Sequence, residues 1–355
     1  MTIRILEKEA LSFDDLILVP LYSDIKSRKE IDTSVVLKKS DGTELKFQTP
    51  IVSSPMSTIT EAYMCNAINS CGGLGIIHRY NTIDHQTKLL SYVNSDIYKA
   101  AAIGASGDYK ERLDRLVEAG LKIVCIDVAH GDHVLVKEAV KHIKQYHPHL
   151  FIIAGNIAGG GAYQRLSEWG VDAIRTSVGS GSICTTRIQT GHGMPTLSAL
   201  IECIERREEL KKLGKHTAYI IADGGIKNTG DIVKCLAIGA DMVMLGSMLS
   251  GTRETPGKVI LDKETGKKVK RYNGMASKAA QKAWKGSYSS IEGVTSYVQY
   301  KGTINKVITE ITSNIRSGMS YSSARSLREL RSNALFVRQS VNSHAEGLPH
   351  IRNRK

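Results

Sequence analysis

Eight short apolar segments recur along the chain, and each is followed by a loop and then by a longer amphipathic segment. Strands that alternate with helices form parallel sheets, and eight such units are the number that closes a barrel. The intervening segments 109–120 and 161–170 have helical apolar spacing and end in Gly, a common helix terminator. We therefore predict an α/β fold, a (β/α)8 TIM barrel with the strands TPIVSS, GLGIIH, KAAAIGA, KIVCIDVAHG, FIIAGNI, DAIRTSVG, AYIIADGG and DMVMLGS.

The length of the chain fits one such barrel. A chain of 355 residues with 41% hydrophobic content can bury a full core. We expect a single domain over 1–355, with a β-ribbon and a mobile flap inserted after strand 8 at residues 250–300, where charge and Gly are frequent. The segment INKVITEITSNIRSGMSYSSARSLREL then predicts two helices that close the barrel.

The composition of the chain indicates which kinds of ligand and which cellular compartment to expect. The net charge of +13 comes from Lys and Arg that are spread along the chain without interleaved aromatics, which favours an anionic small molecule over a specific nucleic acid. The chain contains no run of about 18 apolar residues and no signal-peptide core, so we expect no membrane association and a cytoplasmic location. The six cysteines form no CxxC pair, which argues against a zinc site and a disulfide scaffold.

One loop contains a cysteine that is a candidate catalytic nucleophile. In GSGSICTTR, residues 179–187, Cys184 ends a Gly and Ser loop whose backbone amides are unshielded by side chains. A thiolate in such a loop can act as a nucleophile. Most free cysteines are small core residues instead, and Cys125 in KIVCIDV fits that interpretation.

Eight motifs resemble one enzyme family over nearly the whole chain. They are, in order, LSFDDLILVP, SSPMSTITEA, GGLGIIHR, IDVAHG, GSGSICTTR, IADGGIKNTGDIVKCLAIGADMVMLGS, YNGM and EGV…YKG. This set resembles the inosine monophosphate dehydrogenase (IMPDH) and GMP reductase family. The resemblance implies an oxidoreductase of purine metabolism with a purine nucleoside monophosphate substrate, a nicotinamide cofactor and a homotetrameric assembly. The second barrel unit runs directly into NSDIYKAAAIGA, which leaves no room for the CBS modules usual in the family's dehydrogenases.

The resemblance assigns the catalytic residues. Cys184 would form a covalent bond to C2 of the purine, and Thr186 and Glu292 would work with it as the source of a proton for departing ammonia. Glu residues are more often solvated surface charges, so the role of Glu292 depends on its place in the motif EGVTSYVQYKG.

A larger set of residues matches the family's nucleotide site. Loops after strands seven and eight commonly bind phosphate, Asp223 would accept hydrogen bonds from the ribose hydroxyls, and Met56 and Met275 would lie beside the purine. Asp223 could instead form a turn, and the two methionines could be core residues. Ser57 stands where the family usually has Asp. The predicted substrate-binding residues are Ser54, Met56, Ser182, Asp223, Gly224, Gly225, Gly246, Ser247, Tyr272, Gly274 and Met275.

The resemblance also implies a cofactor site and a cation site. The nicotinamide cofactor would contact Asp127, Ala129, His130 and Gly131, which follow the fourth strand. Backbone carbonyls of Gly179, Gly181 and Cys184 would hold K+. The same glycines could equally serve only to form a turn.

The sequence of the flap indicates the direction of hydride transfer. The family's dehydrogenases activate water with an Arg-Tyr pair there, and MASKAAQKAWKGSYSSIEG contains no Arg. The sequence therefore favours GMP reductase, which uses NADPH to convert GMP into IMP and ammonia. The alternative is IMPDH, which converts IMP into XMP with NAD, because GTRETPG and LSFDDLILVP look dehydrogenase-like and Arg79 replaces the usual Lys. A third hypothesis, a nucleotide-binding barrel without turnover, does not explain why Cys184, Thr186 and Glu292 occur together.

Overall fold

The structure is a computed structural model that describes residues 5–275, 277 and 291–349. Eight parallel strands form one sheet in the order β5-β4-β11-β10-β9-β8-β7-β6. Beyond the end strands, Ile77 bridges to Ala101, and the amide of Ile77 donates to the carbonyl of Ala100 at 3.0 Å, which brings β5 and β6 together. The predicted (β/α)8 barrel is confirmed. Its strands are β4 Ile51–Ser53, β5 Leu74–Gly75, β6 Ala100–Ile103, β7 Ile123–Asp127, β8 Phe151–Ile157, β9 Ala173–Thr176, β10 Tyr219–Asp223 and β11 Met242–Leu245.

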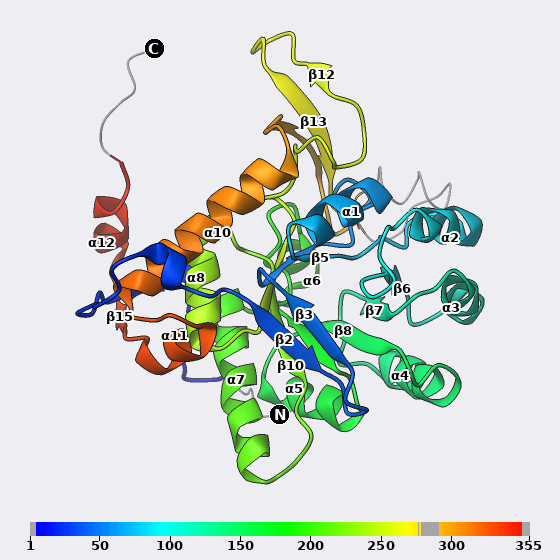
Figure 1. Cartoon of the computed structure of the whole chain (residues 1–355), viewed down its shortest axis with the longest axis horizontal. Coiled ribbons are helices and arrows are strands. Elements are labelled where there is room, and N and C mark those ends of the chain that lie inside the picture. Colours follow the sequence, from blue (N-terminus) through cyan, green and yellow to red (C-terminus); the bar gives the residue numbers. More distant parts are fainter. Residues whose placement is uncertain (1–4, 276, 278–290, 350–355) are drawn as a thin grey trace.

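Helices surround this sheet, as Figure 1 shows. They follow the strands in turn and pack their apolar stripes onto the outside of the barrel. The two helices predicted for the final segment are present as α10 and α11. The helices are α1 Ala62–Ser70, α2 Ile83–Ser91, α3 Tyr109–Glu118, α4 Val134–Tyr146, α5 Gly160–Glu168, α6 Thr186–Thr190, α7 Thr196–Lys212, α8 Thr229–Ile238, α10 Ile304–Tyr321, α11 Leu327–Asn333 and α12 Val341–Glu346, with 3-10 turns η1 Phe13–Asp15 and η2 Arg28–Glu30.

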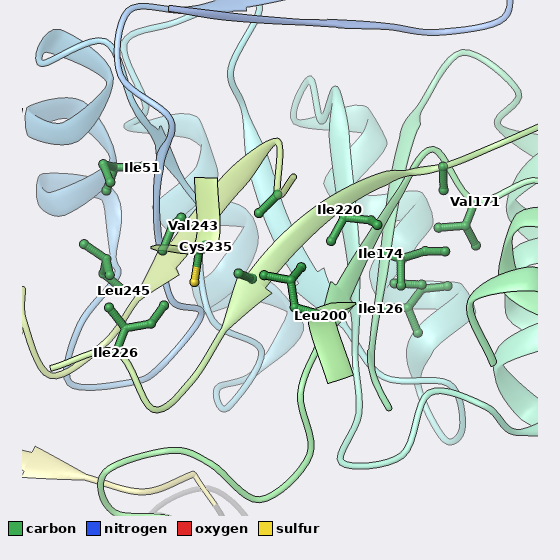
Figure 2. Packing of buried hydrophobic residues seen from close by; sticks show 14 of the residues in the cluster. Ile51, Ile126, Val171, Ile174, Leu200, Ile220, Ile226, Cys235, Val243 and Leu245 are labelled. Atoms are coloured by element: carbon green, nitrogen blue, oxygen red, sulfur yellow. The ribbon is translucent and has the colours of Figure 1, made fainter. Parts of the chain in front are cut away.

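The apolar core has two layers, because side chains alternate between the two faces of each strand. Outward residues such as Val243 and Leu245 pack against the helices, and Figure 2 shows them beside Ile226 and Cys235. Inward residues fill the barrel, and the hairpin of β2 Val35–Lys38 and β3 Glu44–Phe47 adds Leu37, Leu45 and Phe47 to that inner cluster. The end of the barrel at which the strands begin is therefore closed by packed hydrocarbon, which leaves the opposite end for a site.

The segment after β11 adds a small antiparallel sheet to the barrel. It consists of β12 Ile260–Leu261, β13 Lys268–Asn273 and β14 Thr295–Gln299, and Figure 1 shows it projecting from one side. Near the two chain ends, β1 Leu16–Leu18 pairs with β15 Phe336–Arg338. The expected mobile flap falls mainly on 276 and 278–290, outside the described residues. In the described part of the chain, no helix is long and apolar enough to cross a bilayer.

Candidate active site

A cavity of about 290 Å³ lies at the end of the barrel where the strands finish. It is built from the loops after β4, β5, β7, β9, β10 and β11, together with residues of β8, of β13 and of the segments that adjoin β13 and β14. A groove of about 1010 Å³ between α8 and α10 is larger, but no cysteine lines it. The predicted residues that line the smaller cavity are Ser54, Met56, Asp127, Ala129, Gly179, Gly181, Ser182, Cys184, Thr186, Asp223, Gly224, Gly225, Gly246, Ser247, Tyr272, Gly274, Met275 and Glu292.

The loop that carries Cys184 is fixed by backbone hydrogen bonds. The amide of Cys184 donates to the carbonyl of Gly181 at 3.0 Å, and Gly179 adopts a φ of 74°, a conformation that favours Gly. The amide of Thr185 donates to the carbonyl of Glu292 at 2.9 Å. This pairing brings a residue from the segment before β14 against the loop after β9.

Three predicted catalytic side chains, two from this loop and one from the segment before β14, form one row. The Sγ atom of Cys184 lies 3.1 Å from the Oγ1 atom of Thr186, and that hydroxyl donates to Oε2 of Glu292 at 2.7 Å. All three line the cavity, and the thiol is partly exposed to it. In this arrangement a proton can pass from the carboxyl group of Glu292 to the hydroxyl of Thr186, which lies beside the nucleophilic sulfur of Cys184.

Four of the other five cysteines differ from Cys184 in their surroundings, and the fifth, Cys71, is half-buried outside the cavity. Burial raises the pKa of the thiols of Cys125 and Cys203 to about 12, and it also raises the pKa of Cys65 and Cys235. These four side chains are buried in the core. The interpretation of Cys125 as a core residue is in agreement with its complete burial.

The predicted purine contacts converge on a narrow gap. A Cβ atom at Gly246 would lie 3.1 Å from Oη of Tyr272 and 3.4 Å from Sδ of Met56, so only a residue without a side chain fits there comfortably. The amide of Ser57 donates to Sδ of Met275 at 3.2 Å. The position where the family usually has Asp thus holds Met275 through its backbone.

The loop after β10 has the backbone that a phosphate site requires. Gly224 and Gly225 have φ values of 93° and 76°, in the region that favours Gly. The hydroxyl of Thr196 donates to the carbonyl of Gly224 at 2.9 Å, which fixes the turn. Amides without side chains in the way can approach an anion closely.

A charged group that the sequence analysis missed lies beneath the cavity. The guanidinium of Arg175 donates to Asp127 at 2.6 Å and to Asp223 at 2.8 Å, and Nδ2 of Asn156 donates to Asp223 at 2.8 Å. Burial alone would lower the pKa of Arg175, but the charges of the two aspartates raise it well above its usual value. The signal in the sequence was an Arg inside the apolar strand segment DAIRTSVG.

Two predicted cofactor residues lie outside the cavity. His130 is exposed, and the amide of Gly131 donates to the carbonyl of Asn156 at 2.7 Å. A Cβ atom at Gly131 would lie 3.0 Å from the Cα of Gly155, so this position packs against the barrel rim. The structure brings Asp127 and Ala129 into the cavity but not these two residues.

No cluster of three or more His, Cys, Asp and Glu side chains that could hold a metal occurs in the described residues. The predicted cation ligands are backbone carbonyls, a different donor set. Gly179 and Gly181 lie in one short loop with Cys184, and Arg187 places its guanidinium on that loop by donating to Oγ of Ser180 at 2.7 Å.

Comparisons with known proteins show the family of the chain. The family model described as "IMP dehydrogenase / GMP reductase domain" matches residues 10–350. The chain is 31% identical to inosine-5'-monophosphate dehydrogenase of Nitrosopumilus maritimus, with 97% of this chain and 98% of the relative covered. It is 33% identical to the enzyme of the same name from Borreliella burgdorferi, with 97% of each chain covered.

A solved structure of a GMP reductase variant from Trypanosoma brucei, in complex with guanosine 5'-monophosphate, is also similar. Its TM-score is 0.87 at 26% identity, and 98% of each chain is covered. The family model matches nearly the full length of the chain, and the fold and the cysteine loop are in agreement with it. The chain belongs to the IMP dehydrogenase / GMP reductase family of oxidoreductases.

Proposed function

We propose that this protein is a GMP reductase that converts GMP into IMP and ammonia at the expense of NADPH. The hydrogen-bonded row of Cys184, Thr186 and Glu292 at the cavity carries the thiol chemistry of the proposal. A reductase needs a nucleophile at C2 and a proton for the leaving amine, and this row supplies both. Residues 276–291 contain no Arg for water activation, which supports the reductive direction.

The chemistry follows from the order of these groups. The sulfur of Cys184 adds to C2 of the purine, and the amine at C2 leaves as ammonia with a proton from Thr186, which Glu292 replaces. When bound, a reduced nicotinamide supplies the hydride that C2 receives. The C–S bond then breaks, and its electron pair returns to the sulfur of Cys184. The sum is GMP, NADPH and two protons to IMP, NADP+ and ammonium.

The predicted binding residues divide the cavity between two ligands. In the proposal, the loops at Gly224, Gly225 and Ser247 hold the phosphate of the nucleotide, and Asp223 accepts its ribose hydroxyls. Asp127 accepts the ribose hydroxyls of the nicotinamide half. Both carboxylates are partly exposed toward the cavity, with 14% and 16% of their side-chain surface accessible.

IMP dehydrogenase is the second candidate, and the curated relatives favour it. At 31% and 33% identity, both carry that name and are more similar in sequence than the T. brucei GMP reductase at 26%. In that direction the sulfur of Cys184 would add to C2 of IMP, the hydride at C2 would pass to NAD, and water would replace the sulfur at C2 to release XMP and the free thiol. The two candidates share every site residue and differ in the activation of water.

Two mixtures decide between the candidates. The protein is incubated with GMP plus NADPH, and separately with IMP plus NAD, and absorbance at the nicotinamide band is followed. We expect loss of NADPH in the first mixture, no NADH in the second, and neither change with Cys184→Ala. NADH formation in the second mixture alone would establish the dehydrogenase instead. Silence in both mixtures, with binding of GMP intact, would favour a barrel without turnover.

We also propose a K+ ion at the carbonyls of Gly179, Gly181 and Cys184. Carbonyl oxygens suit a monovalent cation, and the carbonyl of Gly181 keeps a second lone pair beside its bond to the Cys184 amide. Replacement of K+ by Li+ at equal ionic strength is expected to lower the rate. Equal rates in both salts would exclude the ion.

The chain is proposed to be one catalytic barrel, without CBS modules, that assembles as a homotetramer. α2 alone connects the end of β5 to β6, and the alignment with the N. maritimus relative spans 481 positions against 355 residues here. Closed symmetry is usual for soluble homo-oligomers. Light scattering after size exclusion should give four times the mass of 38.8 kDa.

A further inference from the structure

The inside of the barrel changes from apolar to charged at its last layer. Inward residues of β7, β9 and β10 are apolar below this layer. The last inward position of each of these strands is Asp127, Arg175 and Asp223. The layer forms the floor of the cavity between the two proposed ligand positions.

Arg175 joins the two carboxylates of this layer. Its Nη1 atom donates to Oδ1 of Asp127 at 2.6 Å, while Nη2 and Nε donate to Oδ2 of Asp223 at 2.8 and 3.1 Å. The side chain is 6% exposed. A fork of several N–H groups can hold two carboxylates at once, and a compact ammonium group cannot do so in the same geometry.

Gly155 makes the contact between Arg175 on β9 and Asp127 on β7 possible. It lies on β8 between Asp127 and Arg175, and it pairs with both in the sheet. A Cβ atom at Gly155 would lie 2.6 Å from the carbonyl oxygen of Arg175 and 2.7 Å from its Cβ. Because this position has no side chain, the guanidinium passes over β8 to reach β7.

We propose that Arg175 is a positioning residue shared by the nucleotide site and the dinucleotide site. It acts through Asp223 on the ribose of the nucleotide and through Asp127 on the ribose of the nicotinamide half. This inference rests on the proposed function, which assigns those two carboxylates to the two ligands. A carboxylate oriented on one side by Arg175 keeps its other lone pairs for hydroxyl donors.

The test measures the two affinities separately in Arg175→Met. Calorimetry gives the Kd of IMP alone, and then the Kd of NADPH at saturating IMP, a pair of ligands that does not react. Arg207→Met is the matched control, because the side chain of Arg207 is also 6% exposed and donates to Asp241 at 2.8 Å outside the cavity. The variants Asp127→Asn and Asp223→Asn measure how much each carboxylate alone contributes to the two affinities.

We expect Arg175→Met to weaken both ligands about tenfold or more, since each carboxylate loses a charged hydrogen bond. Asp127→Asn should weaken only NADPH, Asp223→Asn only IMP, and Arg207→Met neither. Arg175→Lys should restore at most one affinity. If Arg175→Met weakens one ligand or none, or if Lys restores both, the shared role is wrong while the proposed function stands. If the unmodified protein binds neither GMP nor IMP, both are wrong.

Discussion

The hydroxyl of Thr186 donates to Oε2 of Glu292 at 2.7 Å, although 106 positions separate the two residues in the chain. Two backbone hydrogen bonds, from Thr185 to Glu292 and from Val294 to Ile183, hold the segments together. The sulfur of Cys184 lies on the other side of the same hydroxyl at 3.1 Å. Thr186 is thus the link between the nucleophile and the carboxyl group.

This geometry predicts that Thr186→Val lowers kcat about 10²-fold or more while Cys184 still reacts with alkylating reagents. Glu292→Gln should have a similar effect, and the double variant should be no slower than the slower single one, because the two groups act in series. Steady-state kinetics on the three variants tests this. Thr185→Val is the matched control, since the side chain of Thr185 has no hydrogen bond to the α6 backbone. Additive losses in the double variant would show independent roles.

The thiols are predicted to react in a fixed order as pH rises. Alkylation requires the thiolate, and the pKa of about 12 that burial gives Cys125 and Cys203 leaves about 10⁻⁴ of either thiol ionised at pH 8. Cys184 is partly exposed and lines the cavity, so it should take up iodoacetamide before the four buried cysteines. Peptide mass mapping at pH 7, 8 and 9 measures the order. Bound GMP should protect Cys184, and early labelling of the buried pair would contradict the order.

The same raised pKa values bear on stability. Above pH 9, near the ordinary thiol pKa, the unfolded chain loses protons that the folded chain keeps on its buried cysteines. The unfolded state then binds fewer protons, so the free energy of unfolding falls as pH rises further. Urea denaturation at pH 8 and pH 10 should show the fall, and Cys125→Ser and Cys203→Ser should reduce it.

The fold could be predicted because its signals are local. Each barrel strand is a short apolar run before a Gly-containing loop, so the segments FIIAGNI and DMVMLGS sufficed to locate β8 and β11. The cavity residues could be predicted from motifs, since 18 of the predicted positions line it. His130 and Gly131 do not, because the loop after β7 turns onto the rim and Gly131 packs on β8.

Arg175 and Asn156 could not be predicted in the same way. Their importance lies in partners on other strands, Asp127 and Asp223, and the spacing of residues in one strand does not reveal which strand a long side chain reaches. A charged residue in an apolar strand is a signal only when its inward direction is known. That direction follows from the register of the closed sheet.

Gly246 is predicted to set the width of the purine site. In Gly246→Ala the new Cβ atom would press on Oη of Tyr272 at 3.1 Å and on Sδ of Met56 at 3.4 Å. We expect a higher KM for the nucleotide, with the KM of the dinucleotide unchanged. Gly257→Ala is the control, since nothing lies within 4 Å of a Cβ atom there, although its φ of 91° adds backbone strain. An unchanged nucleotide KM would place the purine elsewhere.

Lys270 is predicted to hold the strand that carries the purine contacts. It is 2% exposed, and its ammonium donates to the carbonyls of Thr252, Arg253 and Thr255. Two residues later on β13, Tyr272 enters the cavity. Lys270→Met would leave these buried carbonyls without their donor, and we expect the free energy of unfolding to fall by about 2–4 kcal/mol. Thermal or urea denaturation measures this.

The exposed Lys268 on the same strand gives the matched control, Lys268→Met, which should change stability by less than about 0.5 kcal/mol. Lys270→Ala offers a sharper test, because the space left by the side chain is lined by the same carbonyl oxygens. Methylammonium chloride should then raise the melting temperature of Lys270→Ala and lower its nucleotide KM, and NaCl of equal ionic strength should do neither. Equal effects of both salts would mean that the ammonium of Lys270 has no specific role at the carbonyls.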